Sequence, residues 1–147
     1  MLKINKSILS FIVITCFLFS GAALSAKYPI AGNYNTNKVK NIERYYSALS
    51  NKNFKSLTKV FIKNPLVITS KVGKVNPFDF YPKRFKTIEQ FSPHIISISA
   101  IGNKYFVRYH LDMTESGIKG TREFLDQIEF KQGTNLIAKI HMFENQY

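Results

Sequence analysis

A change of hydrophobic period near residue 93 constrains the fold of this chain more than any other feature. Beyond that point apolar and polar residues alternate, which is the spacing of β-strands with one buried face. Turn signals interrupt the alternation at Gly102-Asn103, at ESGIKG and at KQGTN. The pattern therefore predicts four consecutive antiparallel strands, over residues 94–100, 104–114, 121–130 and 136–144.

The first half of the chain has helical spacing instead. Apolar residues between Val39 and Leu49 recur at intervals of three and four, and Asn37 or Thr36 can cap that helix. A second, short helix is expected over residues 54–61, because its apolar residues again share one stripe. An Asn-Pro pair ends it, since proline disfavours the α conformation in the residue before it.

The stretch between the helices and the strands has mixed signals. Residues 66–70 are β-branched enough for a short strand, whereas residues 71–86 have no period and predict a long loop or a hairpin remnant. Thr87 can cap a brief helical turn that Pro93 closes. Helices first and an antiparallel meander afterwards predict an α+β domain, in which N-terminal helices pack on one face of the sheet.

The amino-terminal segment predicts export. Lys3 and Lys6 precede an apolar run and then small residues, which is the layout of a secretory signal peptide. The apolar run is shorter than the ~20 residues of a spanning helix, so cleavage is favoured over an uncleaved anchor. We therefore expect a signal peptide (1–26), a flexible entry segment (27–37) and one domain (38–147) that resides in the periplasm or outside the cell.

The positions of cysteine and histidine argue against stabilisation by disulfides or by a bound metal. The only cysteine, Cys16, lies in the expected signal peptide, so the mature domain has neither a disulfide framework nor a thiolate metal site. The three histidines are scattered singly, without metal-ligand spacing. We therefore predict no structural metal and no cofactor.

The charge of the chain is unevenly placed. Of a net charge of +12, the excess lies between Lys38 and Lys86, where twelve Lys and Arg residues accompany only two acids. A basic surface attracts anionic partners. Because lysine outnumbers arginine, which supplies bidentate base and phosphate contacts, a solvated basic surface is favoured over specific nucleic-acid binding. Peripheral membrane contact is likewise not favoured.

Alternation also assigns side chains to the two faces of the sheet. In residues 121–130, Asp126 falls on the inner face with Phe124 and Ile128. A buried carboxylate is costly without a partner, so Asp126 either pairs with a neighbour, such as Arg122 or Tyr45, or serves a pocket. Inward positions on the neighbouring strands include Tyr109, Ile140, Met142 and Glu144, and outward ones include Arg108, His110 and Asp112, which we interpret as a surface row.

Two stretches of the chain resemble the nuclear transport factor 2-like superfamily, which includes the SnoaL-like proteins and ketosteroid isomerases. NIERYYSALSNKNFKSLTKVF is similar to the opening two helices, and FLDQIEFKQGTNLIAKIHMFEN is similar to the last hairpin. The resemblance extends from about Asn37 to Glu144. It implies a cystatin-like cone, in which a curved antiparallel sheet surrounds the helices and leaves a pocket at its open end.

The resemblance also implies roles for particular residues. The isomerase pattern places its oxyanion-holding tyrosine at Tyr45 and its protonated acid at Asp126, where an apolar site keeps the acid neutral. Its general base falls at Thr69, whose hydroxyl cannot abstract a proton from carbon at neutral pH. Ketosteroid-type isomerisation is therefore not expected unless another acid, such as Asp79, reaches the pocket.

The leading hypothesis is an exported SnoaL-like protein that binds a small, largely apolar ligand in its cone. One alternative is a small isomerase or dehydratase that uses Asp126 with Asp79 or Glu144. Another is a periplasmic adaptor that uses its basic helical face. A homodimer through the outer sheet face, at Phe106 and Phe143, is a further expectation. The predicted pocket residues are Tyr45, Tyr109, Asp126, Ile140, Met142 and Glu144.

Overall fold

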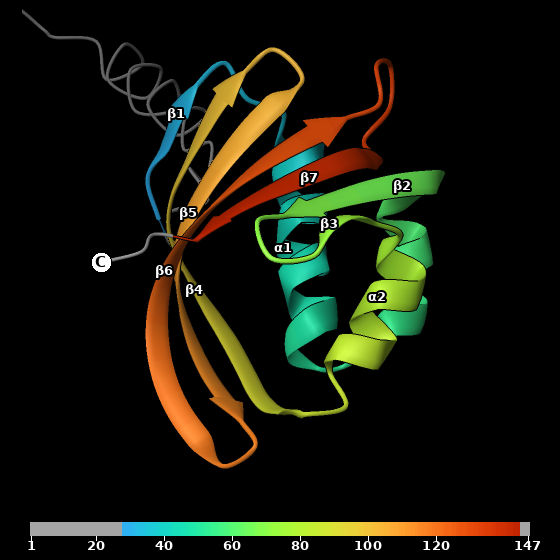
Figure 1. Ribbon diagram of the computed structural model, residues 1–147. Coiled ribbons are helices and arrows are strands. Elements are labelled where there is room, and N and C mark those ends of the chain that lie inside the picture. The colour runs from blue at the N-terminus through green and yellow to red at the C-terminus, as the bar shows by residue number, and fades with distance from the viewer. Residues whose placement is uncertain (1–27, 145–147) are drawn as a thin grey trace, which may run out of the picture.

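The computed structural model of the protein describes residues 28–144, so the expected signal peptide lies outside the described residues. A curved sheet of seven strands partly encloses the helices on its concave side (Figure 1). The helices are α1 (Thr36–Ser50), the 3-10 helix η1 (Phe54–Lys59) and α2 (Pro77–Arg84). The strands are β1 (Ile30–Gly32), β2 (Phe61–Thr69), β3 (Gly73–Val75), β4 (Ile88–Ile101), β5 (Lys104–Glu115), β6 (Ile118–Phe130) and β7 (Ile137–Glu144).

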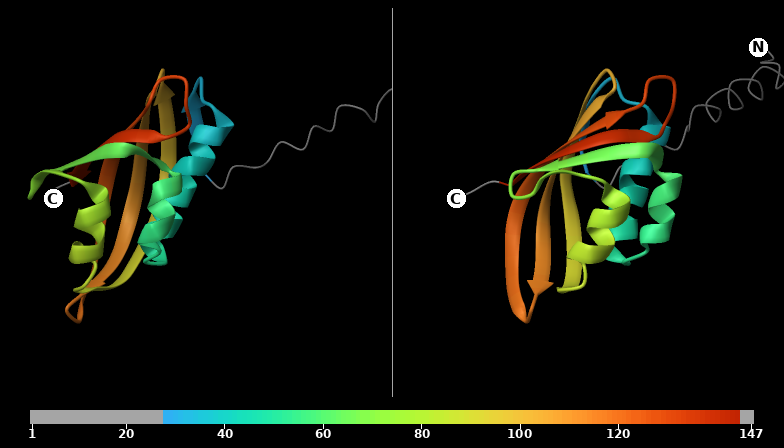
Figure 2. Two further views of the ribbon diagram at one scale, coloured as in Figure 1. Left: turned by 90° about the vertical axis from the view of Figure 1, so that its right-hand side faces the viewer. Right: turned by 45° about the vertical axis from the view of Figure 1, so that its right-hand side comes forward.

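The strand order is β1-β4-β5-β6-β7-β2-β3. Strands β4 to β7 form the expected antiparallel meander, and its three turns confirm the interpretation of the turn signals. Two parallel pairs, β1 with β4 and β2 with β7, extend the sheet on either side. The two views of Figure 2 show the long strands bending around the helices. The α+β class and the cone shape are thus confirmed, and the sheet is mixed rather than purely antiparallel.

Helix α1 fills the concave side of the sheet. It begins after Asn35, whose side-chain oxygen accepts hydrogen bonds from the backbone N–H groups of Asn37 and Lys38, at 2.9 and 3.3 Å. The cap is therefore one residue earlier than Thr36. The core residues that α1 and the inner face of β5 to β7 share are fully buried, as the alternation predicts; they include Ile42, Tyr45, Tyr109, Ile128 and Ile140.

The helical turn expected at residues 87–93 is wrong, because the long strand β4 begins at Ile88 and runs through Pro93. Pro93 misled the interpretation, since proline normally excludes a strand. Here Pro93 pairs with Leu111 of β5, and β1 pairs with β4 only at residues 98–100. The part of β4 around Pro93 therefore lies at the sheet edge. On that side no neighbouring strand of the sheet needs a hydrogen bond from the backbone N–H that proline lacks.

Two other expectations before the meander need correction. The second helix is a 3-10 helix that ends at Lys59, and β2 starts at Phe61 and runs through Pro65. The register between β2 and β7 shifts between Phe61 and Leu66, so Pro65 lies in an irregular stretch that does not need its N–H. The stretch over 71–86, expected to be a long loop or a hairpin remnant, contains β3, which forms a hairpin with β2, and then helix α2.

Part of the expected entry segment is also ordered into the sheet. Strand β1 pairs with residues 98–100 of β4, and α1 already starts at Thr36. Gly32 has a φ of +84°, and a Cβ there would lie 2.3 Å from the Ala100 carbonyl oxygen. The close approach of β1 to β4 thus requires glycine at this position. Within residues 28–144, no helix is long and apolar enough to cross a membrane.

Candidate functional site

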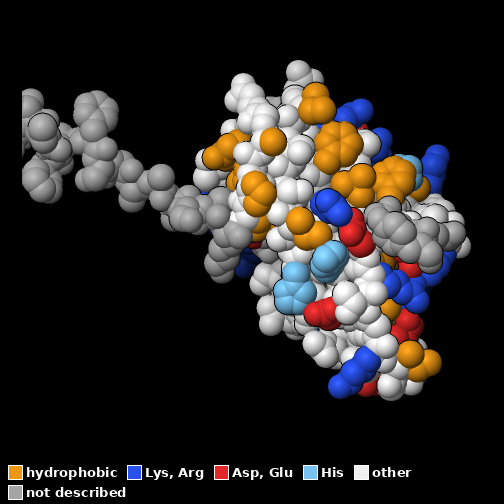
Figure 3. Space-filling model, turned by 90° about the vertical axis from the view of Figure 1, so that its left-hand side faces the viewer, with side chains coloured by type: hydrophobic (Ala, Val, Ile, Leu, Met, Phe, Trp, Pro, Cys, Tyr) orange, Lys and Arg blue, Asp and Glu red, His pale blue; other side chains and the backbone are white. Residues whose placement is uncertain are grey.

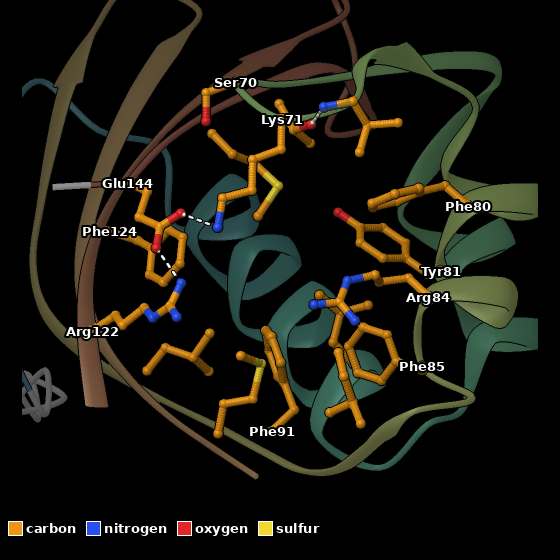
Figure 4. A pocket seen from close by; sticks show the side chains of 17 residues that line it. Ser70, Lys71, Phe80, Tyr81, Arg84, Phe85, Phe91, Arg122, Phe124 and Glu144 are labelled. Atoms are coloured by element: carbon orange, nitrogen blue, oxygen red, sulfur yellow. Dashed lines mark hydrogen bonds and ion pairs between the residues drawn. The ribbon is translucent and has the colours of Figure 1, made fainter. Parts of the chain in front are cut away.

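A cavity of about 140 Å³ lies between helix α2 and the ends of strands β4 to β7. Figure 4 shows side chains of α2 on one side of it and side chains of β6 and β7 on the other. Nine of the lining residues are large and apolar: Leu49, Phe80, Phe85, Ile88, Phe91, Leu111, Met113, Phe124 and Met142. The remaining lining residues are Thr69, Ser70, Lys71, Val72, Tyr81, Arg84, Arg122 and Glu144.

Local sequence explains why α2 forms one wall of the cavity. Asn76 caps the helix by accepting the Phe78 N–H at 2.9 Å, and Pro77 occupies the first turn, where its missing N–H costs nothing. Tyr81 and Phe85, one turn apart, then face the sheet and are buried. This Asn-Pro helix start was the signal by which the sequence could have revealed the wall.

Charged groups gather at the mouth of the cavity around Glu144. The register places Glu144 of β7 opposite Phe124 of β6. One Glu144 oxygen accepts from Arg122 at 2.5 Å, and the other lies 3.1 Å from the Lys71 ammonium (Figure 4). Partial burial raises the pKa of Glu144, but hydrogen bonds and charge from both cations outweigh it, so the pKa lies below its usual value. Glu144 is therefore a charged, weakly basic carboxylate.

A second ion pair joins α2 to the sheet. The Arg84 guanidinium donates two hydrogen bonds to Glu115 at the end of β5, one of them at 2.8 Å, and Thr87 donates a third at 2.9 Å. The bond from Arg84 lowers the pKa of Glu115 to about 2. This bidentate pair holds the end of α2 against the β5–β6 hairpin.

Asp126 lies behind the cavity in a buried cluster with two tyrosines. Its carboxylate is 0 % exposed and accepts hydrogen bonds from Tyr46 at 2.8 Å and from Tyr109 at 3.4 Å. Loss of solvation raises the pKa of Asp126 to about 7, although the two hydrogen bonds oppose the rise. Burial likewise raises the pKa values of both tyrosines, so they remain donors.

Tyr45 and Tyr81 connect this cluster to the cavity. Their hydroxyls are hydrogen-bonded at 2.5 Å, and Tyr81 lines the cavity. The Tyr45 ring packs on Tyr46, with ring centroids 4.9 Å apart, and the Tyr109 ring stacks on Phe124 at 5.5 Å. The buried cluster around Asp126 thus adjoins the cavity wall through the Tyr45–Tyr81 hydrogen bond and the Tyr109–Phe124 stack.

The six residues predicted for the pocket divide into two groups. Met142 and Glu144 line the cavity, whereas Tyr45, Tyr109, Asp126 and Ile140 are fully buried and are absent from its wall. Asp126 points inward as the alternation predicts. Its partners, however, are Tyr46 and Tyr109 rather than Tyr45 or Arg122.

The acids and the hydroxyl considered for proton transfer lie apart from one another. Asp79 is exposed on α2 and does not line the cavity, so it does not supply a second acid there. Thr69 lines the cavity, but its hydroxyl oxygen accepts the Val72 N–H at 3.0 Å. Glu144 is accordingly the single carboxylate in the cavity wall among residues 28–144.

The outer face of the sheet carries the predicted surface row. His94 contacts Asp112 at 3.2 Å, and Glu123 contacts both Arg108, at 2.5 Å, and His110, at 3.4 Å. These are exposed pairs, each of which contributes little to stability. Across residues 28–144, no three His, Asp or Glu side chains cluster in a way that could hold a metal ion.

Comparisons with known proteins identify the fold. No protein-family model and no curated sequence matches this chain. Among solved structures, a protein from Shewanella denitrificans proposed to be a SnoaL-like polyketide cyclase has a TM-score of 0.66 at 11% identity, covering 76% of this chain and 92% of that one. An LEH-like epoxide hydrolase from M. tuberculosis has a TM-score of 0.64 at 12% identity, covering 75% and 84%.

A third structure includes a bound small molecule. It is a protein from Catenulispora acidiphila with a ketosteroid isomerase-like fold, in complex with trimethylamine, with a TM-score of 0.64 at 10% identity, covering 71% of this chain and 84% of that one. At such low identity, these similarities establish the fold alone. The chain has the nuclear transport factor 2-like fold, as its sequence predicted.

Proposed function

We propose that this protein binds a small, largely apolar ligand in the cavity between α2 and strands β4 to β7. The observation that carries the proposal is the composition of the cavity wall, which is mostly apolar and aromatic, with Lys71, Arg84, Arg122 and Glu144 as its charged residues. An apolar cavity of about 150 Å³ can hold a molecule of the size of benzene. The complex of the Catenulispora protein with trimethylamine is a precedent for a small ligand on this fold.

Binding is proposed without a reaction. An isomerase or dehydratase needs two carboxyl groups that converge on one ligand atom. Glu144 is the one carboxylate in the described part of the wall, and its lowered pKa makes it a weak base. Asp126 is fully buried and does not line the cavity, so it would support the wall rather than contact the ligand.

A blocked cavity provides the test. Met142 lies in the wall and is half-buried, so Met142→Trp should fill the cavity, while Met142→Leu keeps the volume nearly constant. A ligand of this size gains at most about 1.5 kcal/mol per non-hydrogen atom, so roughly millimolar to micromolar affinities are expected. Affinities for a panel of small aromatic and alicyclic compounds are measured by NMR titration.

We expect Met142→Trp to weaken binding by roughly tenfold or more and Met142→Leu to leave it nearly unchanged, because one substitution occupies the ligand's space and the other preserves it. Circular dichroism checks that both variants are folded. The proposal fails if no compound binds the wild-type protein, or if Met142→Trp binds as well as Met142→Leu.

We also propose that the mature protein is exported. The support is the layout of residues 1–26, with two lysines, an apolar run and small residues in order. The intact mass of the protein recovered from its native cell reports whether the segment has been removed. A retained segment would contradict cleavage and would favour the alternative of an anchored adaptor, for which vesicle binding through the basic helical half is the corresponding test.

The outer sheet face suits a second copy of the chain. Phe106, Leu125, His141 and Phe143 are neighbours there by strand register, and Phe143 is exposed. Figure 3 shows hydrophobic side chains gathered over the upper part of this face. Burying such a patch favours association. A monomeric mass for the wild-type protein in sedimentation analysis at high concentration would refute the proposed homodimer.

A further inference from the structure

We propose that the ligand carries a carboxylate, which binds at the cavity mouth against Arg122 and Lys71 while its apolar body occupies the cavity. This inference rests on the proposed function, because it names the chemical class of ligand for the same site. Two observations support it: positively charged side chains outnumber carboxylates at the mouth, and most of the remaining wall is apolar.

The cations at the mouth outnumber the carboxylates. Arg84 is matched by Glu115, which also accepts from Thr87. Glu144, by contrast, is shared by Lys71 and Arg122, one cation on each oxygen. The charge of Arg122 also helps to lower the pKa of Glu115, so Arg122 interacts with both carboxylates. Three cations (Lys71, Arg84 and Arg122) therefore face two carboxylates (Glu115 and Glu144), which leaves one positive charge in excess. A ligand carboxylate would supply the missing negative charge and restore the balance.

Exposure leaves these two cations free to reorient. The side chain of Glu144 is 14 % exposed, whereas those of Lys71 and Arg122 are 65 % and 51 % exposed. The protein carboxylate is thus held at the wall, and the two cations approach it from the solvent side. The exposed cations can turn toward a ligand at small cost, and the planar guanidinium can bind a carboxylate through two parallel hydrogen bonds.

The rest of the cavity wall has no charged group left to pair with the charge of a ligand. Arg84 is already bound to Glu115. The other polar side chains of the wall are neutral hydroxyls, those of Thr69, Ser70 and Tyr81. A charge buried without a partner would be strongly unfavourable. The charged end of a ligand must therefore lie at the mouth, and the size of the cavity limits the buried part to roughly one ring.

An ammonium ligand fits the site less well than a carboxylate. The aromatic rings of Phe80, Phe85, Phe91 and Phe124 could attract a cation through their faces. At the mouth, however, a cation would meet Arg122 and Lys71, whose only shared carboxylate is already engaged. The balance of charge therefore selects an anion.

Matched ligand pairs test this inference. The affinities of benzoate and benzamide, and of phenylacetate and phenylacetamide, are measured by NMR titration at low ionic strength. Because a hydrogen bond to a charged group is worth more than one to a neutral group, each carboxylate should bind roughly tenfold tighter than its amide. Equal affinities for acid and amide would overturn the inference while the proposed function stands. If neither member of a pair binds, the proposed function itself fails, and the inference fails with it.

Three variants locate the effect. Arg122→Gln and Lys71→Gln should each lower the ratio of carboxylate to amide affinity several-fold, and Lys71, in an exposed turn, can be replaced with little risk to folding. Glu144→Gln should raise that ratio several-fold, because both cations lose their internal competitor. A merely structural role for Glu144 would not produce that increase.

A remote charge serves as the control. Lys131 lies in the β6–β7 turn, at the other end of the hairpin from Glu144, and Lys131→Gln removes the same charge. It should leave the ratio unchanged. If Lys131→Gln and Arg122→Gln lower the ratio equally, the preference reflects the overall charge of the protein and the proposed carboxylate site is wrong. A lower ratio in Glu144→Gln would also contradict it.

Discussion

The free energy of unfolding of the wild-type protein, measured relative to that of Asp126→Asn, should fall by about 4 kcal/mol between about pH 4 and pH 8. The pKa of Asp126 rises from 3.8 to about 7 on folding, mainly because burial removes water from the carboxylate. A rise of about three pKa units, at about 1.4 kcal/mol each, accounts for the magnitude.

The sign of this prediction follows from proton binding. Below about pH 4, Asp126 is protonated in both states and contributes no difference. Between about pH 4 and pH 7 the unfolded chain releases the proton while the folded protein keeps it, so stability falls as pH rises. Above about pH 7 both states are ionised, and the loss levels off.

Other acids affect the wild-type curve in the opposite direction. The pKa values of Asp112, Glu115 and Glu123 are lowered by hydrogen bonds from Thr121, Arg84 and Arg108 respectively, so these groups add stability as pH rises toward about 4. The Asp126→Asn variant retains these three acids, so their effect cancels when its free energy of unfolding is subtracted from that of the wild-type protein. Urea unfolding of both proteins across this pH range is the measurement. A pH-independent difference would mean that water reaches Asp126 in the folded protein.

Ile140→Ala should lower the free energy of unfolding by about 2–5 kcal/mol and leave ligand affinity nearly unchanged. Ile140 is fully buried, pairs with Ile128 on one side and Val67 on the other, and does not line the cavity. Its truncation leaves a void in the closed core. Urea unfolding gives the stability, and NMR titration with the ligand panel gives the affinity.

Met142→Ala is the matched control on the same strand, two residues further along. Met142 is half-buried and lines the cavity, so its truncation should cost less stability and should change the affinity for small ligands by enlarging the site. The reverse pattern, in which Ile140→Ala alters affinity more than Met142→Ala, would show that the ligand binds deeper in the core than the cavity between α2 and the sheet.

Local patterns predicted part of the site. Alternation along β6 assigned Asp126 to the inner face, and it is indeed buried there beside Ile128. The same pattern assigned Met142 and Glu144 to the inner face of β7, where they line the cavity. These assignments succeed because the side-chain direction in a strand depends on neighbouring residues alone.

Other parts of the site could not be predicted from local sequence patterns. Tyr45 and Tyr46 are both buried on α1, but only Tyr46 donates to Asp126, 80 residues away along the chain. Which of two adjacent tyrosines reaches an acid on the sheet depends on the rotation of the helix over the sheet. The spacing of apolar residues along a helix does not specify that rotation. The resemblance assigned the role to Tyr45, and nothing in the sequence could show that Tyr46 is the tyrosine that reaches Asp126.

The amino-acid sequence by itself determined the α+β class, the order of the meander and the inward position of Asp126, because hydrophobic period and turn chemistry act over a few residues. Only the tertiary structure decided that α2 forms a cavity wall, that Pro93 lies on a free sheet edge and that Glu144 meets Lys71 and Arg122. These features depend on the curvature of the sheet and on the register between distant strands. They arise when separate elements pack together, so no single stretch of sequence encodes them.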